Sequence, residues 1–227
     1  MELKKTFKSE LEKLKKMSTK DKMWYIFEYY KFHMIAILLF LFVLWVIGSS
    51  IYRQTFTTRL TFAIINDYSG GNSSMDPLEN GLKKALGCGK KDLIEINSNL
   101  FINTDESQSA EYTYASMAKV TALAVGGDLD IMIADAKTLE HYESQAAFAD
   151  LKEFLPSDLV ERAEKEDLFL YVDNGNGQSV PAAISLAPTD FADMTGAVIN
   201  EPYLAVMTTS QHTEDTIQAI RWLFDQK

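Results

Sequence analysis

The six residues LDIMIA, at positions 129–134, give the clearest indication of the fold. This short apolar run follows the pair Gly126-Gly127 and ends at a polar residue, Asp135. A run of this length, bounded by turn-forming residues, is typical of a strand buried inside a sheet. The sequence therefore predicts a buried strand over residues 129–134.

Strand-like and helical stretches alternate along the chain around this run. β-type composition predicts further strands at residues 59–66, 93–96, 168–172, 180–186 and 203–208. Helical patterns predict helices at residues 76–86, 107–125, 137–147, 157–166 and 213–225, the first of them closed by Gly87. The strands at 168–172 and 180–186 flank DNGNGQS, whose two Asn-Gly pairs favour a tight hairpin turn. This alternation, with one hairpin inserted, predicts an α/β domain with a mixed sheet over residues 53–227.

A segment without formal charge covers residues 34–52, and its first part, MIAILLFLFVLWVIG, is almost wholly apolar. A helix over these residues would span roughly 28 Å at about 1.5 Å per residue, close to the hydrocarbon thickness of a bilayer. Aromatic residues of the kind that form interfacial belts crowd its two ends: Trp24, Tyr25, Phe27, Tyr29, Tyr30, Phe32 and Tyr52. We therefore expect one transmembrane helix at residues 34–52. The 33 residues before it are long for the n-region of a signal peptide, and Gly48, Ser49 and Ser50 make a poor cleavage site, so we expect an uncleaved anchor.

The charge is distributed unevenly along the chain. Residues 1–33 hold nine Lys against five acidic residues, whereas residues 34–227 hold 13 basic and 27 acidic residues. A Lys-rich flank stays on the cytoplasmic side, so the N-terminus is expected inside and residues 53–227 outside the cell membrane. One helical face of the basic segment carries Leu3, Phe7, Leu11 and Leu14. This amphipathic segment either lies on anionic lipid or serves only to fix the orientation.

The composition also argues against several functions. The acidic body would repel phosphates, so no nucleic acid partner is expected. A single cysteine excludes an internal disulfide framework, and no HExxH, GxSxG, Walker or CxxC motif occurs. We expect no enzyme and no cofactor; the enzymatic alternative is a hydrolase that uses Asp128, Asp130 or His141.

Two local features suggest a metal or a reactive group but have simpler explanations. The stretch 173–177 (DNGNG) has Gly at its third and fifth positions, where a calcium loop needs oxygen ligands, so we expect a turn and no metal. Cys88 stands beside Lys90 and Lys91, which would lower the pKa of a thiol. The simpler interpretation is a small residue at a helix end.

The best candidate site lies where two predicted strands end. The strand at 59–66 leads into the loop 67–74 (DYSGGNSS), and the strand at 129–134 leads into Asp135 and Lys137. If these strands are parallel neighbours, both loops open on the same edge of the sheet, where ligands of α/β proteins bind. The candidate ligand-binding residues are Asp67, Tyr68, Ser69, Gly70, Asp135 and Lys137. The alternative is that Asp135 only caps its helix and the Gly pair only turns the chain.

Three quoted stretches resemble a known family. GDLDIMIADAKTLEHYESQAAFADLKEFLP (127–156) looks like the segment of type 2 periplasmic-binding, extracellular solute-binding proteins in which a strand leads into a helix and then a turn. LFLYVDNGNGQSVPAAISL (168–186) and EPYLAVMTTSQHTEDTIQAIRWL (201–223) are similar to the hairpin and the strand–helix unit that end one lobe. FEYYKFHM (27–34) resembles the entry to the helix in single-pass membrane proteins of Gram-positive gut bacteria. Solute-binding proteins usually have two lobes, so the resemblance implies one lobe or a reduced pair.

Together these features lead to a functional expectation. The protein would be a membrane-anchored, extracytoplasmic binding domain without catalytic activity, a sensor or accessory subunit for a small solute or a membrane protein partner. The alternative is a structural or scaffold protein of the cell envelope that has no small-molecule site.

Overall fold

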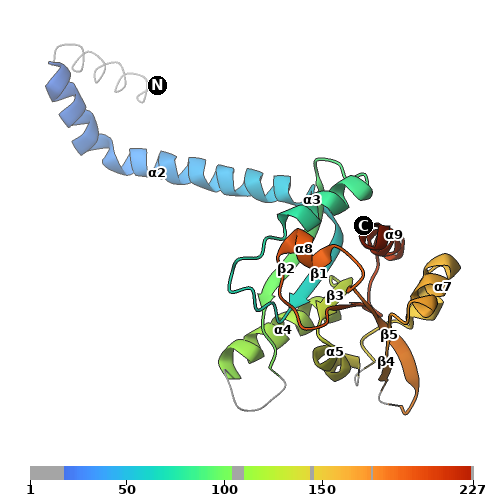
Figure 1. Cartoon of the computed structure of the whole chain (residues 1–227). Coiled ribbons are helices and arrows are strands. Elements are labelled where there is room, and N and C mark those ends of the chain that lie inside the picture. Colours follow the sequence, from blue (N-terminus) through green and yellow to red (C-terminus); the bar gives the residue numbers. More distant parts are fainter. Residues whose placement is uncertain (1–17, 104–109, 144–145, 175, 226–227) are drawn as a thin grey trace. The chain divides into compact units, whose positions relative to one another are not determined.

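The computed structural model describes residues 18–103, 110–143, 146–174 and 176–225 (Figure 1). The chain divides into two compact units, Met1–Thr55 and Phe56–Lys227. The predicted amphipathic segment, with Leu3, Phe7, Leu11 and Leu14, lies outside the described residues.

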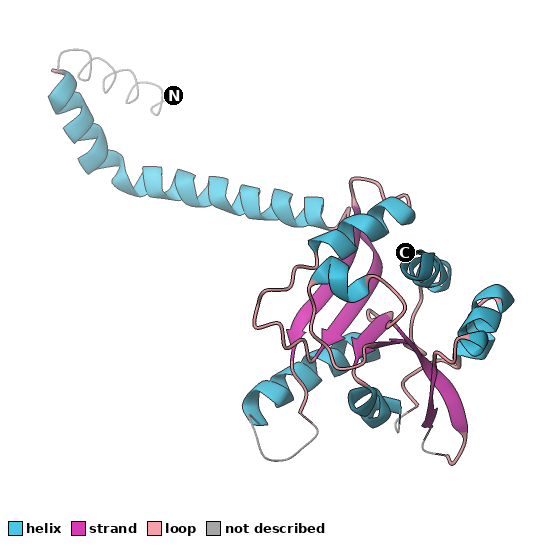
Figure 2. Ribbon diagram, viewed as in Figure 1, coloured by secondary structure: helices cyan, strands magenta, loops and turns pink. Residues whose placement is uncertain are grey.

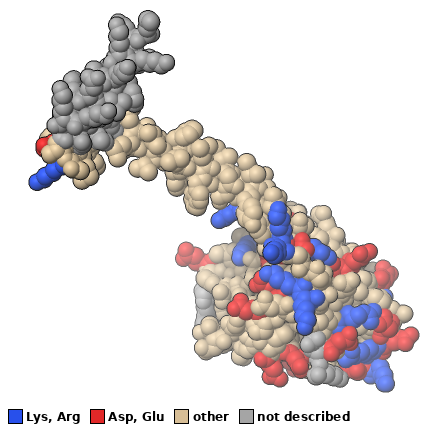
Figure 3. Space-filling view, turned by 90° about the horizontal axis from the view of Figure 1, so that it is seen from above, with Lys and Arg blue, Asp and Glu red and all other residues tan. Residues whose placement is uncertain are grey.

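The described part of the first unit is dominated by one long helix, α2 (Thr19–Arg53). It begins well before residue 34 because Ser18 caps it, accepting a hydrogen bond from the backbone N–H of Asp21, and because residues 19–33 contain neither Gly nor Pro. Within the described residues one stretch, Lys31–Arg53, is long and apolar enough to cross a membrane, and it contains the predicted segment 34–52. Figure 3 shows the surface of α2 almost free of charged atoms between its ends.

The second unit, which we call the globular unit, is built on a six-stranded mixed sheet (Figure 2). The strands are β1 (Thr57–Ile65), β2 (Asp92–Leu100), β3 (Ile131–Ala134), β4 (Phe169–Asp173), β5 (Ser179–Ser185) and β6 (Tyr203–Val206). Their order is β2-β1-β3-β6-β5-β4; β1 pairs in parallel with β2 and β3, and the other pairs are antiparallel. The predicted α/β fold with a mixed sheet is confirmed.

Helices cover both faces of this sheet. They are α3 (Asp76–Ala85), α4 (Ala110–Gly126), α5 (Ala136–Glu143), α6 (Leu151–Phe154), α7 (Ser157–Lys165), α8 (Phe191–Thr195) and α9 (Thr213–Asp225). Figure 1 shows α3, α8 and α9 on one face and α4 and α5 on the other. The result is a three-layer α/β/α arrangement.

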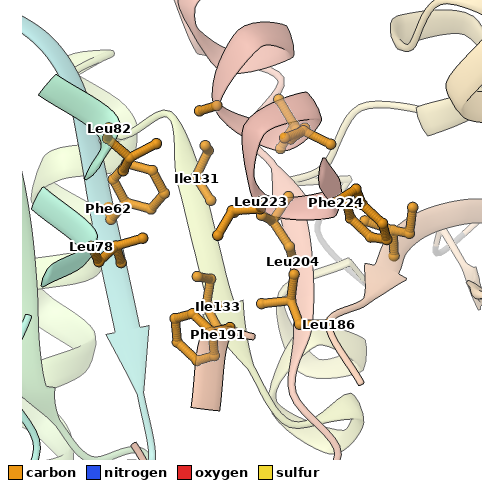
Figure 4. Packing of buried hydrophobic residues seen from close by; sticks show 14 of the residues in the cluster. Phe62, Leu78, Leu82, Ile131, Ile133, Leu186, Phe191, Leu204, Leu223 and Phe224 are labelled. Atoms are coloured by element: carbon orange, nitrogen blue, oxygen red, sulfur yellow. The ribbon is translucent and has the colours of Figure 1, made fainter. Parts of the chain in front are cut away.

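Alternation along β1 divides the core into two clusters. Phe62 and Ile64 belong to the cluster under α3, α8 and α9, whereas Ala63 and Ile65 belong to the cluster under α4 and α5. Figure 4 shows Phe62 packed among Leu and Ile side chains of the helices and neighbouring strands. All four of these β1 residues are fully buried, as expected for a central strand between two helical layers.

The boundaries of two predicted elements need correction, and two short helices were not predicted. The strand predicted at residues 93–96 extends to Leu100, because β1 supplies pairing partners for the polar residues that follow position 96. The helix predicted at 137–147 ends at Glu143, whose carboxylate accepts a hydrogen bond from the backbone N–H of Phe148. The short helices α6 and α8 were not predicted, since four or five residues carry too little periodicity.

The predicted hairpin at residues 168–186 is confirmed. Strands β4 and β5 pair antiparallel, and the N–H of Asn174 donates to the carbonyl of Gln178 at the turn. Gly177 has φ of 75°, a conformation that favours glycine. The Asp173 side chain accepts from the N–H of Gly177, so this carboxylate stabilises the turn.

Candidate functional site

The candidate site lies at a topological switch point of the sheet. From β1 the chain continues to β2 on one side, then crosses over to β3 on the other side of β1. Strands β1 and β3 are parallel neighbours, so the loops that follow them open on the same edge, as the sequence predicted. In open α/β sheets, ligands bind in the crevice at such a point. Because β6 is antiparallel to β3, the segment before Tyr203 reaches this edge too.

Asn66, the first residue after β1, connects the loops at this edge. Its amide Nδ2 donates to the carbonyl of Ile102 at 3.1 Å, to Asp135 Oδ2 at 2.8 Å and to Thr138 Oγ1 at 3.0 Å. Its Oδ1 accepts from the N–H of Ile102 at 2.9 Å. Asn66 is 5% exposed and has φ of 61°, a left-handed conformation that Asn tolerates better than most residues. One buried side chain thus joins the ends of β1, β2 and β3.

Asp135 caps helix α5. Its Oδ1 accepts from the N–H of Thr138 at 2.9 Å, and its Oδ2 accepts from the Thr138 hydroxyl at 3.0 Å. The capping role considered from the sequence is therefore present. Together with the bond from Asn66, these contacts fix the orientation of the carboxylate.

A cleft of about 370 Å³ opens directly above these residues. Its volume is at the small end of the range of roughly 300–1,000 Å³ that is usual for small-molecule sites. Buried Asn66, Ile102 and Thr138 and half-buried Asp135 contribute to its wall. Exposed side chains complete its rim, from Tyr68, Asn103, Lys137, Asn200 and Glu201. Glu201 also has a left-handed backbone, with φ of 47°.

Three of the six predicted ligand-binding residues line this cleft and three do not. Tyr68, Asp135 and Lys137 line it, whereas Asp67, Ser69 and Gly70 are not among its lining residues. The sequence prediction missed Asn66, Ile102, Asn103, Ala136, Thr138, Asn200 and Glu201. Asn66 and Thr138 directly adjoin the predicted residues, but nothing in the sequence indicates that Asn200 and Glu201 reach the same edge.

Asp67 is occupied by contacts within the protein. Its Oδ1 accepts from the backbone N–H groups of Ser69 and Val198, both at 2.9 Å, and its Oδ2 accepts from the hydroxyls of Ser69 and Ser73. Desolvation by burial raises the pKa of Asp67, but these hydrogen bonds outweigh it, so the pKa lies below the ordinary 3.8. The carboxylate ties the loop after β1 to the segment before β6.

Tyr68 stands at the rim beside other aromatic side chains. The residue is 65% exposed, and its ring packs edge-on against Phe101, with ring centroids 5.8 Å apart. Its backbone N–H donates to the carbonyl of Val198, which holds the residue in place. An exposed, positioned ring of this kind can stack on a ligand or bind a cation over its face.

A second polar cluster lies at the opposite edge of the sheet. Asp130, fully buried before β3, accepts from the Thr61 N–H at 2.8 Å and the Ser210 hydroxyl at 2.6 Å. His212 Nδ1 lies 3.0 Å from its Oδ1, and His212 lines a separate cleft of about 330 Å³. The histidine beside Asp130 is thus His212, which was not among the residues considered for a hydrolase from the sequence.

Within the described residues, no group of three or more His, Cys, Asp or Glu side chains is arranged to hold a metal ion. The thiol of Cys88 is half-buried. Desolvation raises its pKa and outweighs the opposing effect of Arg59, so the lowering considered from Lys90 and Lys91 is wrong.

No protein-family model and no curated protein matches the chain. Among solved structures, it is similar to an extracellular solute-binding protein family 1 from Alicyclobacillus acidocaldarius subsp. acidocaldarius DSM 446, with 16% identity and a TM-score of 0.30. The match covers 57% of this chain and 28% of that protein, so the chain spans little more than a quarter of its length. A likeness this weak carries no argument about what the chain does.

Proposed function

We propose that the globular unit captures a small polar solute in the cleft at the ends of β1 and β3. The observation that carries this proposal is the cleft at the switch point, where Asn66 joins three strand ends and helix α5 begins. Rigid walls that present fixed polar groups beside one exposed aromatic ring are characteristic of small-molecule sites.

The proposal also includes the location of the protein in the cell membrane and its orientation there. Lys31–Arg53 would anchor the protein in the membrane through residues 34–52, with the Lys-rich N-terminus in the cytoplasm, in contact with anionic lipid. The globular unit would then meet its solute outside the cell. In this arrangement the protein would act as a sensor or as an accessory subunit of a membrane complex.

We propose binding without catalysis. Neither His nor Cys is among the cleft-lining residues that the structure describes. The hydroxyl of Thr138 donates to Asp135 Oδ2, and Asp135 Oδ1 caps α5 by accepting from the backbone N–H of Thr138, so these groups serve the local structure. The Asp130–His212 pair lies at the opposite edge, where His212 lines a different cleft and Asp130 is fully buried.

The test is a thermal-shift screen of the full chain in nanodiscs against sugars, amino acids, short peptides and divalent metals. A solute at a hundredfold excess over its dissociation constant adds about 2.7 kcal/mol to the stability of the native state. We expect a shift that is lost in Tyr68→Ala and kept in Tyr171→Ala, a comparably exposed tyrosine on β4 outside the cleft. A chain that melts cooperatively but shifts with no solute would contradict the proposal.

One observation favours a second function, that of an envelope scaffold. Helix α4 turns apolar residues to solvent, with Tyr112 52%, Tyr114 69% and Val125 82% exposed. Tyr114 and Val125 stand eleven residues apart and share one face of the helix, and a protein partner would contact this exposed face. If the protein is such a scaffold, Tyr114→Glu should abolish in-membrane cross-links to the protein partner, and no solute in the screen should raise the melting temperature.

A further inference from the structure

A very short connection joins the long helix, which ends at Arg53, to strand β1, which begins at Thr57. The N–H of Thr55 still donates to the carbonyl of Tyr52 in the helix. The N–H of Thr57 already donates to the carbonyl of Lys91, which directly precedes β2. Two Cα–Cα steps of about 3.8 Å separate Thr55 from Thr57, so this stretch spans at most about 8 Å. The chain itself therefore keeps the start of β1 near the end of α2.

Four lysines lie at the edge of the sheet where β1 begins. Lys83 and Lys84 stand in the last turn of α3, and Lys90 and Lys91 directly precede β2. The first residue of β2 pairs with Thr57, so the register places the second pair of lysines beside the point where the chain enters the sheet. We call Lys83, Lys84, Lys90 and Lys91 the basic corner.

The basic corner differs in charge from the rest of the globular unit. Residues 56–227 hold 12 basic and 27 acidic residues, whereas residues 80–91 hold the four lysines and no acidic residue. The two carboxylates that flank this stretch are already engaged. Glu79 Oε1 lies 2.5 Å from Lys83 Nζ, and Asp92 Oδ2 accepts a hydrogen bond from a backbone N–H at 2.7 Å. The basic corner is therefore a region of positive charge on an acidic unit.

Lys84 and Lys90 are the two members of the basic corner that can meet a partner from outside. Both are exposed, and within the described part of the chain neither has an ion-pair partner. Lys83 is paired with Glu79, and Lys91 has an interaction of its own within the protein. The simpler role of Lys84 is to complement the carbonyl end of α3, and that role is the same in any lipid. Lys90 lies outside the helix and has no such role.

The other charged groups at this edge belong to different elements. Asp130 is buried before β3, and Asp215 in the first turn of α9 binds Arg59. Asp128 and Glu214 are exposed near the same two elements. These carboxylates repel other anions, so an anionic partner is favoured only at the basic corner, beside α3 and β2.

The proposed membrane anchor brings the basic corner to the lipid headgroups. With residues 34–52 in the hydrocarbon, Arg53 lies at its border, and the headgroup layer extends roughly 5–8 Å further. The connection of at most about 8 Å keeps the backbone of Lys91 close to this layer. Charges act over a Debye length of about 8 Å at physiological ionic strength. A lysine near an anionic surface gains about fivefold in binding.

We propose that the basic corner binds anionic lipid headgroups of the extracytoplasmic leaflet through Lys84 and Lys90. This inference rests on the proposed anchor at residues 34–52 and goes beyond solute binding. The ammonium groups pair with headgroup phosphates, which are the anions that a lipid surface presents. The cleft lies at the other end of β1, so this contact leaves the cleft open to the solution.

The test is acetylation of the lysines of the full chain in nanodiscs, followed residue by residue by mass spectrometry. One set of nanodiscs contains phosphatidylcholine alone, and the other also contains anionic phosphatidylglycerol. We expect Lys84 and Lys90 to react about fivefold more slowly in the anionic set, because bound ammonium groups are shielded from the reagent. Lys119 on α4 and Lys165 on α7 are references in the same sample and should react equally in both sets. At about 1 M NaCl, where the Debye length is about 3 Å, the protection should disappear.

A second arm separates a lipid surface from a free phosphate. Glycerol phosphate is added to the nanodiscs of phosphatidylcholine alone, and we expect Lys84 and Lys90 to react as fast as before. Equal protection by glycerol phosphate and by phosphatidylglycerol would identify a site for soluble anions and would overturn the lipid inference.

Paired variants identify the groups responsible. Lys84→Gln combined with Lys90→Gln changes two exposed side chains, so this variant is expected to fold. Hydrogen exchange of residues 82–92 should be slower in the anionic nanodiscs for the wild type, and this difference should vanish in the variant. The matched control, Lys119→Gln combined with Lys165→Gln, makes the same change in net charge elsewhere and should keep the difference.

The outcomes separate this inference from the proposed anchor. If the chain co-elutes with the nanodiscs but Lys84 and Lys90 react equally in both lipids, the inference alone is overturned. Protection that survives about 1 M NaCl also overturns it, because a contact between exposed charges is screened. If the chain is not retained in the nanodiscs, both the inference and the proposed anchor fail.

Discussion

Asn66 does more for the candidate site than any other single residue. Its amide group bonds the loop after β2 and the first turn of α5, and its backbone has a left-handed conformation. Replacing it leaves buried donors and acceptors without partners and also places a new side chain at φ of 61°. The unpaired groups belong to the hydrogen-bond network and the strain belongs to the backbone. A control substitution at another left-handed residue therefore separates the two contributions.

We expect Asn66→Ala to lower the free energy of unfolding by about 2–4 kcal/mol, from the buried groups left unpaired and the strain of a left-handed alanine. The matched control is Asn99→Ala, at an exposed residue with the same φ of 61°, which should cost only about 1–2 kcal/mol. Urea denaturation of both variants measures the difference. Equal losses would show that the side-chain network of Asn66 contributes nothing.

The protonation state of Asp67 predicts how stability depends on pH. Its folded pKa is below the ordinary 3.8, so its stabilisation is complete at higher pH and is lost as pH falls through the folded value. We expect Asp67→Asn to have a lower melting temperature than the wild type at pH 7 and a difference that shrinks below about pH 4. Melting curves between pH 7 and pH 2.5 measure this.

The control for Asp67 is Asp193→Asn, at an exposed residue of α8. Its melting temperature should stay close to that of the wild type at neutral pH. If the gap between Asp67→Asn and the wild type stays constant from pH 7 to pH 2.5, the ionised carboxylate does not stabilise the loop.

At the scale of elements, α9 closes one face of the sheet. Ile220, Leu223 and Phe224 are almost fully buried in the cluster around Phe62, as Figure 4 shows for Leu223 and Phe224. Arg59 on β1 binds Asp215 on α9 through two hydrogen bonds of 2.6 Å. The helix is thus held by apolar packing along its length and by an ion pair near its start.

We expect Leu223→Ala to lower the free energy of unfolding by about 2–5 kcal/mol, because it leaves a cavity between α9 and the sheet. Gln218→Ala, an exposed position on the same helix, should change stability by less than about 0.5 kcal/mol. Chemical denaturation of the full chain gives both values. A small effect of Leu223→Ala would mean that α9 does not pack tightly on this face.

The helices and strands that were predicted correctly differ from those that were missed in how far they depend on local sequence. The apolar run at residues 129–134 predicted the central strand, which the structure has at Ile131–Ala134, and the Asn-Gly pairs predicted the hairpin, because both depend on local composition. The second half of β2 was missed because its polar residues are held in the strand by pairing with β1, which is not a local property. The short helices α6 and α8 were missed for lack of periodicity.

Part of the candidate site could also be predicted from the sequence. The two loops after β1 and β3 were expected together, because parallel neighbours end on one edge. Asn200 and Glu201 come from a segment far along the chain, and only the antiparallel placement of β6 brings them there. Asp67 was expected to face a ligand, but the number of local donors around it could not be read from the sequence.

For the whole molecule, the main prediction concerns orientation in the membrane. With Cys88 replaced by Ala, a cysteine introduced at exposed Gln178 should react with a membrane-impermeant maleimide on intact cells. A cysteine introduced at Ser18, before the long helix, should react only after the cells are opened. Labelling of Ser18→Cys from outside would contradict the proposed orientation. The mass of the mature protein tests whether the anchor is retained.

The central claim is that the cleft at the ends of β1 and β3 binds the solute. Hydrogen exchange of the full chain in nanodiscs, with and without a solute that raises the melting temperature, tests it most directly. We predict slower exchange in the loops after β1, β2 and β3 and in the segment before β6, all of which line the cleft. Protection confined to α4, or to residues 208–215 at the opposite edge, would contradict the account.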